Sequence, residues 1–98
     1  MTINKIANEK ELTIMVGGRL DTMTAPTLEA EIKENIAGME KLILDFAALE
    51  YISSAGLRVI LSAQKIMNKQ GEMIVKNVNE IVNEIFEITG FCDVLTIE

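Results

Sequence analysis

The sequence of 98 residues contains no histidine and no tryptophan, and it has one cysteine and one proline. Without histidine, a serine hydrolase lacks its usual general base and a phosphocarrier lacks its usual phosphoryl acceptor. Cys92 is the single cysteine, so no disulfide can form within the chain and no zinc site rich in Cys or His is available. These absences argue against an enzyme, and we expect no catalytic residue, no cofactor and no metal.

Charge and hydropathy argue against two further classes of protein. The net charge is −6 and the nine Lys and Arg residues are scattered, which disfavours binding to nucleic acid and to anionic membranes. No apolar run approaches the roughly 20 residues that span a bilayer, and the first residues lack the apolar stretch of a signal peptide. We therefore expect a cytoplasmic protein that is a monomer when free.

Aromatic residues are also scarce, with three Phe and one Tyr, so aliphatic side chains and most of the six Met residues must fill the interior. Apolar residues make up 49% of the sequence, which suits one packed domain over residues 1–98. Free cysteines are usually buried, so Cys92 is expected to be a small core residue near the last strand.

The apolar periodicity predicts strands and helices in alternation. Segments 3–7 and 12–16 are strand-like and are separated by a short polar stretch, which indicates a hairpin. Helices are expected after the N-cap Thr24 and from Ser54 to about Lys69. The other expected elements are strands at 42–44, 73–75 and 94–97, and a helix that Asn77 or Asn79 caps and Gly90 ends. This order, ββαβαβαβ, predicts an α/β fold with a mixed, mainly parallel central sheet and packed helices.

Two adjacent hydroxyls, Ser53 and Ser54, stand at the entry to the second helix. One of them suffices as an N-cap, which contributes about 1 kcal/mol and leaves the other unexplained. A phosphoserine at a helix N-terminus is well tolerated, because free N–H groups and the helix dipole favour its charge. The small residues Ala55 and Gly56 would let a partner approach the backbone closely. A phosphoryl group placed there would repel an acidic or apolar partner surface without unfolding the domain.

The run from Asp45 to Leu57, read as DFAALEYISSAGL, resembles the signature of the STAS domain, and more closely that of the small bacterial anti-sigma factor antagonists. The resemblance extends over essentially the whole chain. Residues 18–21 with 24, 25 and 28 are similar to the family's segment before the first helix, residues 71–73 to a strand entry, and residues 88–91 to the end of the third helix. The family implies a STAS-like fold and a regulatory protein that is not an enzyme.

The resemblance also implies a mechanism. An unmodified antagonist binds an anti-sigma factor that is also a serine kinase, and the sigma factor is released for transcription. The kinase, which itself binds ATP, then phosphorylates the antagonist and releases it, and a phosphatase resets the cycle. By position, Ser54 is the phosphorylated residue. Asp21 and Thr24 are implied at the partner surface, together with Ser53, Ala55 and Gly56.

One position departs from the family pattern. Many members have Asp before the phosphorylated serine, where this chain has Ser53, so the modified residue is Ser54 or Ser53, with position favouring Ser54. Two other functional classes are compatible with the composition. One is a constitutive STAS scaffold, in a stressosome-like assembly or as a regulator of a transporter or metabolic enzyme. The other, a small enzyme or phosphocarrier, is disfavoured by the missing histidine.

Overall fold

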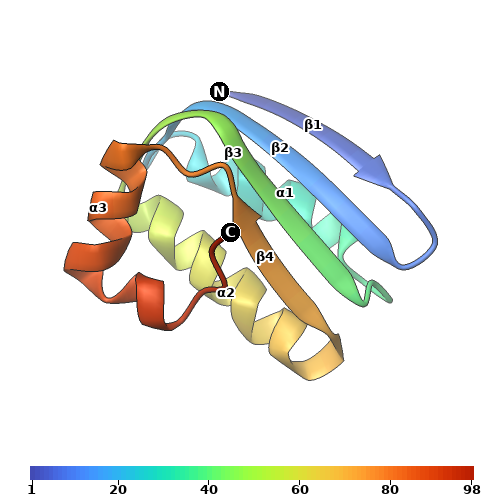
Figure 1. Cartoon of the computed structure of the whole chain (residues 1–98). Helices are drawn as coiled ribbons and strands as arrows, with labels where there is room; N and C mark the ends of the chain where they lie inside the picture. Colours follow the sequence, from blue (N-terminus) through green and yellow to red (C-terminus); the bar gives the residue numbers. More distant parts are fainter.

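The computed structural model describes residues 1–98 as a layer of strands with helices packed against it (Figure 1). The hairpin predicted at the N-terminus and all three predicted helices are present. Along the chain the elements are β1 (Thr2–Ala7), β2 (Glu11–Leu20), α1 (Ala25–Asn35), β3 (Lys41–Ile52), α2 (Ser54–Gln70), β4 (Glu72–Lys76), α3 (Glu80–Thr89) and a short 3-10 helix, η1 (Phe91–Asp93).

The four strands form one mixed sheet in the order β1-β2-β3-β4. The first two strands are antiparallel, while β2 pairs with β3 and β3 with β4 in parallel. Each parallel connection needs a crossover, and α1 and α2 provide the two crossovers. The expectation of an α/β fold with a mixed, mainly parallel sheet is confirmed.

One face of the sheet carries the core. Side chains alternate along β2 and β3, so that every second residue is buried toward the helices and the others are partly exposed on the opposite face. Figure 1 shows the helices gathered on one side of the sheet. Of the 27 buried residues, 23 form one hydrophobic cluster, whose largest fully buried members include Leu12, Ile14, Leu42, Leu44, Phe46, Leu28, Ile60, Met67 and Phe86.

The central strands are longer than the sequence pattern indicates. β2 continues beyond Val16 through the glycine pair Gly17 and Gly18 to Leu20. Its pairing with β3 shifts register between Met15 and Gly17 and again between Gly18 and Arg19. Gly18 has φ +85°, which glycine adopts without strain. The glycine pair is therefore part of the strand, and the extra residues at both register shifts belong to β3, between Asp45 and Ala48 and between Leu49 and Tyr51. The segment expected as a loop after Leu44 belongs to β3, because its backbone pairs with the second half of β2.

The end of the chain differs from the expected strand over 94–97. After α3 the chain forms η1, and a single parallel bridge joins Ile97 to Val75. Gly90 ends α3 with φ +80°, as expected of a helix C-terminus. The prediction that Cys92 is buried is wrong: it is exposed, because the turn of η1 directs its neighbour Phe91 toward the core instead.

Two further expectations concern the methionines and the membrane. The expectation that most of the six Met residues fill the interior is wrong: only Met67 and Met73 are buried, and Met23, in the loop between β2 and α1, is 85% exposed. None of the helices is both long enough and apolar enough to span a bilayer.

Candidate functional site

The β2–α1 loop and the start of α2 meet at one edge of the sheet. Leu20 at the end of β2 pairs with Ile52 at the end of β3, and the N–H of Ser53 donates to the carbonyl oxygen of Leu20 at 2.8 Å. The β2–α1 loop (residues 21–24) therefore lies beside the first turn of α2. Loops at the carboxyl ends of parallel strands are where open α/β sheets usually place their binding sites.

Ser53 is the N-cap of α2. Its backbone is extended (φ −96°, ψ 175°), and its hydroxyl oxygen accepts a hydrogen bond from the N–H of Gly56 at 3.4 Å. The residue is half-buried. Ser53 thus provides the structural capping function that one of the two serines was expected to have.

Ser54 is the first residue of α2, and its environment is different. It is exposed, and its hydroxyl forms no hydrogen bond within the chain. The 17-residue helix has no acidic side chain in its first turn, so nothing on the helix offsets the partial positive charge of its N-terminus. A free hydroxyl at this position can be reached by a macromolecule and can carry an anionic group.

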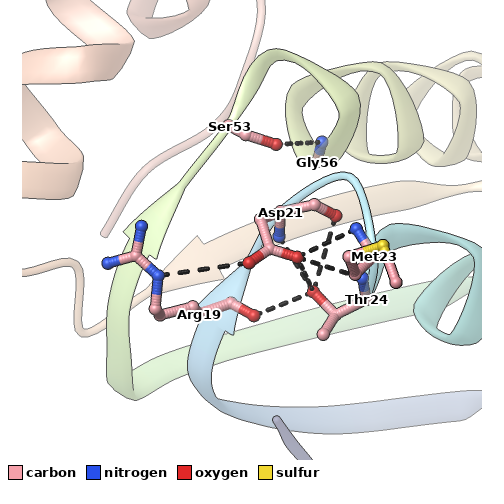
Figure 2. A network of polar contacts seen from close by, with 6 residues as sticks. All are labelled: Arg19, Asp21, Met23, Thr24, Ser53 and Gly56. Carbon is pink, nitrogen blue, oxygen red and sulfur yellow. Dashed lines mark hydrogen bonds and ion pairs between the residues drawn. The ribbon is translucent and has the colours of Figure 1, made fainter.

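Asp21 and Thr24 hold the β2–α1 loop in shape through reciprocal hydrogen bonds (Figure 2). One carboxylate oxygen of Asp21 accepts from the N–H groups of Met23 at 3.0 Å and Thr24 at 3.1 Å. The Thr24 hydroxyl accepts from the N–H of Asp21 and donates to the carbonyl oxygen of Arg19, both at 2.8 Å. Thr24 occupies the N-cap position of α1, but its side chain does not cap the helix. Its hydroxyl folds the loop instead.

The polar contacts around Asp21 favour its charged form. Desolvation raises its pKa, but the hydrogen bonds from two loop N–H groups and the Thr24 hydroxyl, with the charge of Arg19, outweigh that effect and lower it below the ordinary 3.8. The Arg19 Nε lies 4.0 Å from the other Asp21 oxygen, and its guanidinium stacks over the ring of Tyr51 at 4.5 Å. The site edge therefore presents one fixed carboxylate and one stacked cation.

Ala55 and Gly56 follow Ser54 but do not play the same role. Ala55 is half-buried. Gly56 is buried, and a Cβ at this residue would lie 2.7 Å from Cγ of Leu20 and 2.9 Å from Cγ1 of Ile52. The expectation that Gly56 opens the backbone to a partner is corrected: it has no side chain because α2 packs closely against the ends of β2 and β3.

Beside Ser54, α1 and α2 enclose a surface hollow of about 290 Å³. Ala55 belongs to its lining, as does Arg58, one helical turn after Ser54. The sequence reasoning did not identify Arg58, although its i+4 spacing from Ser54 on a predicted helix was a usable signal. The other lining residues are Thr22, Ala25, Pro26, Glu29 and Val59. No group of three or more His, Cys, Asp and Glu side chains is arranged to hold a metal ion.

Comparison with protein families gives a match over nearly the whole chain. A family model described as the STAS domain matches residues 2–98. The protein BtrV of Bordetella bronchiseptica, whose name assigns it provisionally as an anti-sigma factor antagonist, is 35% identical over 99 residues, which cover 99% of this chain and 84% of BtrV. The anti-sigma-B factor antagonist of Bacillus subtilis is 28% identical over 91 residues, covering 92% of this chain and 84% of that protein.

The fold is also similar to that of solved structures. The anti-sigma factor antagonist SpoIIAA in its unphosphorylated form superposes with a TM-score of 0.77 and 17% identity, covering 99% of this chain and 87% of that one. A structure of the Bacillus cell fate determinant SpoIIAA in its phosphorylated form superposes with a TM-score of 0.76 and 18% identity, covering 99% and 91%. At this level of identity the likeness concerns the fold.

Proposed function

The chain belongs to the STAS domain family, and we propose that it is an anti-sigma factor antagonist whose binding is switched off by phosphorylation of Ser54. Anti-sigma factor antagonists are regulatory binding proteins, and this chain is accordingly not an enzyme. The observation that carries the proposal is the exposed, unbonded hydroxyl of Ser54 at the N-terminus of α2.

In this mechanism the unmodified chain binds an anti-sigma factor through the loop of Asp21 and Thr24 and the first turn of α2. Binding displaces the sigma factor, which is then free to join RNA polymerase. The fixed carboxylate of Asp21 gives this surface a negative charge that a basic side chain of the partner can meet. The half-buried Ser53 and Ala55 complete the contact surface on the helix side.

The partner is also the kinase, and it holds the ATP. The Ser54 Oγ attacks the γ-phosphorus, so a new O–P bond forms while the bond from the γ-phosphorus to the β,γ-bridging oxygen breaks; ADP leaves and the hydroxyl proton is released. The product carries about −1.5 to −2 charges at neutral pH. The basic side chain that meets Asp21 lies over the β2–α1 loop, and we propose that the partner surface over the first turn of α2 is acidic or apolar. The new charge on Ser54 therefore weakens the complex, and each ~1.4 kcal/mol corresponds to a tenfold change in affinity. A phosphatase restores the hydroxyl.

The assignment of Ser54 rather than Ser53 rests on hydrogen bonding and exposure. Ser53 is half-buried and its oxygen already accepts from the N–H of Gly56. A phosphoryl group on Ser53 would disturb the helix cap, whereas one on Ser54 leaves the cap intact. That SpoIIAA, which shares the fold, was solved in a phosphorylated and an unphosphorylated form supports a switch of this kind.

The decisive experiment combines two variants of Ser54 with a candidate anti-sigma factor kinase from the same organism. We expect Ser54→Ala to bind the kinase like the parent chain but to remain bound when ATP is added. Ser54→Asp should bind at least about tenfold more weakly. Ser53→Ala tests the other hydroxyl: the loss of the cap and of one contact weakens its binding, but it should still become phosphorylated and be released when ATP is added. Binding is measured by calorimetry, and the modified residue by mass spectrometry of peptides.

The alternative function, a constitutive STAS scaffold, predicts a different result. Its binding to a partner would be unaffected by ATP, by the kinase and by either change at Ser54. Modification of Ser53 in place of Ser54 would move the switch to the other hydroxyl. If Ser54→Ala were released by ATP in the same way as the parent chain, the proposed switch would be wrong.

A further inference from the structure

The cation nearest to Ser54 along its own helix is Arg58, and it has no partner in the chain. Arg58 is exposed and takes part in none of the five ion pairs of the structure. It lines the hollow between α1 and α2 together with Glu29, but the Glu29 carboxylate lies 3.8 Å from the Nζ of Lys33 on its own helix. A free guanidinium therefore stands one turn from the free hydroxyl.

Helix geometry places these two residues next to each other. Residues four apart on an α-helix have Cβ atoms about 5–6 Å apart on the same face. The Cα–Cβ bonds tilt toward the helix N-terminus, so a side chain as long as that of Arg58 can reach back to a group on Ser54. A guanidinium presents parallel N–H groups that match two oxygens of a phosphoryl group, and it stays charged at all relevant pH values.

We propose that Arg58 is the counter-ion of the phosphoryl group on Ser54 and holds it as a dianion at the rim of the hollow. The inference rests on the proposed function, because it concerns the modified form of that site. A free phosphoserine has its second pKa at about 6 and is only partly dianionic near neutrality. Pairing with Arg58 extends the full double charge to lower pH. The switch then keeps its strength at pH values where an unpaired phosphoserine gains a proton.

Other charges around the phosphoryl position oppose this effect only weakly. On α1, Glu29 shares the hollow but is paired with Lys33. In the β2–α1 loop, the carboxylate of Asp21 is held by loop N–H groups and faces Arg19. On α2 itself the first turn has no acidic residue. Arg58 is thus the unpaired charge nearest to Ser54 on this helix face, since Lys65 lies two turns further along.

The test uses the full chain with phosphoserine placed at position 54 by genetic encoding, so that no kinase is needed. Phosphorus NMR follows the second pKa of the phosphoryl group in the parent chain and in Arg58→Gln, Arg58→Lys and Lys65→Gln. We expect this pKa to rise by about 0.3 pH unit or more in Arg58→Gln, since exposed i,i+4 pairs are of that strength. The pKa in Arg58→Lys should lie between those of the parent chain and Arg58→Gln, because a lysine keeps the charge but not the paired N–H groups.

Lys65 is the matched control, an exposed and unpaired cation two turns further along α2, and its removal should leave the pKa unchanged. Equal values for Arg58→Gln and the parent chain would overturn the inference. Binding of the same phosphorylated chains to the anti-sigma factor separates the two proposals. Full binding by the parent phosphoprotein refutes the phosphorylation switch, whereas a weakened complex with unchanged pKa in Arg58→Gln refutes only the role of Arg58.

Discussion

Four small residues in succession, Ser53 to Gly56, meet four different environments. Ser53 caps the helix, Ser54 faces solvent with a free hydroxyl, Ala55 lines the hollow and Gly56 contacts the core. Composition and position were enough to predict that one serine caps and the other is available for modification. They were not enough to predict that Gly56 is a packing residue. The side chains that exclude a Cβ there belong to the ends of β2 and β3, and only the tertiary fold brings these strand ends close to α2.

Replacing Gly56 with alanine tests that packing. Alanine has the higher helix propensity by about 1 kcal/mol, so an exposed Gly→Ala change in α2 would stabilise the protein. Here the new methyl group would meet Leu20 and Ile52 at less than 3 Å, and overpacking of this kind costs about 1–3 kcal/mol. We expect Gly56→Ala to lower the free energy of unfolding in urea. Ser54→Ala in the same turn is the control and should change it by less than about 0.5 kcal/mol. A Gly56→Ala chain as stable as the parent would contradict this account.

Among the elements, the helices were predicted best because their apolar positions recur with helical spacing and their ends carry recognisable residues. The strands were predicted in place but not in length. The second half of β3 is partly polar and carries extra residues opposite Gly17 and Gly18, and no periodicity in the sequence indicates such a bulged register. The segment 94–97 has the composition of a strand but pairs with β4 through a single bridge.

The start of α3 depends on one side chain that the sequence left open between Asn77 and Asn79. Asn79 is the cap: its Oδ1 accepts from the N–H of Val82 at 2.8 Å, and its Nδ2 donates to the carbonyl oxygen of Leu49 in β3 at 2.7 Å. Asn77 instead has φ +61° and donates to the Asp45 carboxylate at 3.0 Å. Asn79 thus both starts α3 and attaches it to the sheet.

Removing the Asn79 side chain should therefore lose two interactions at once. Asn79→Ala is expected to lower the free energy of unfolding by about 2 kcal/mol, from one lost cap and one lost hydrogen bond to the part-buried carbonyl oxygen of Leu49. Asn79→Asp keeps the capping oxygen but not the N–H donor, so its free energy of unfolding should fall by less. Asn83→Ala is the control, because the half-buried Asn83 side chain bonds only to Glu87 on the same helix. The interpretation fails if Asn79→Ala and Asn79→Asp are equally stable, or if Asn83→Ala is affected to the same extent.

On the scale of the whole molecule, the chain folds around one core while carrying a net charge of −6. Its radius of gyration of 12.1 Å is close to the roughly 13 Å expected for a compact domain of about 100 residues. The fold stabilises two carboxylates, Asp21 and Asp45, in their charged form, and both also contribute to solubility. Asp21 shapes the loop at the site, and Asp45 accepts from the Asn77 side chain and the N–H of Ala47, where the pairing of β3 with β2 shifts register.

These carboxylates make stability depend on pH on the acid side. The hydrogen bond from Asn77 lowers the pKa of Asp45, desolvation opposes it, and the N–H of Ala47 and the charge of Lys76 lower the pKa further. A carboxyl whose pKa is lower in the folded than in the unfolded state stabilises the fold above its unfolded pKa, here 3.8, and loses that contribution as pH falls through the folded value. We expect the free energy of unfolding to decrease from about pH 5 downward.

Asp45→Asn isolates the contribution of this carboxylate. The variant should be less stable than the parent chain at pH 7, because the amide accepts more weakly from Asn77, and the difference should shrink as the parent is protonated below about pH 4. Asp93→Asn, an exposed change in η1, controls for the loss of one negative charge and should follow the parent curve. Urea unfolding at pH 7, 5, 4 and 3 gives the comparison. A gap between parent and Asp45→Asn that stayed constant across this range would mean that Asp45 supports the strand by its shape and not by its charge.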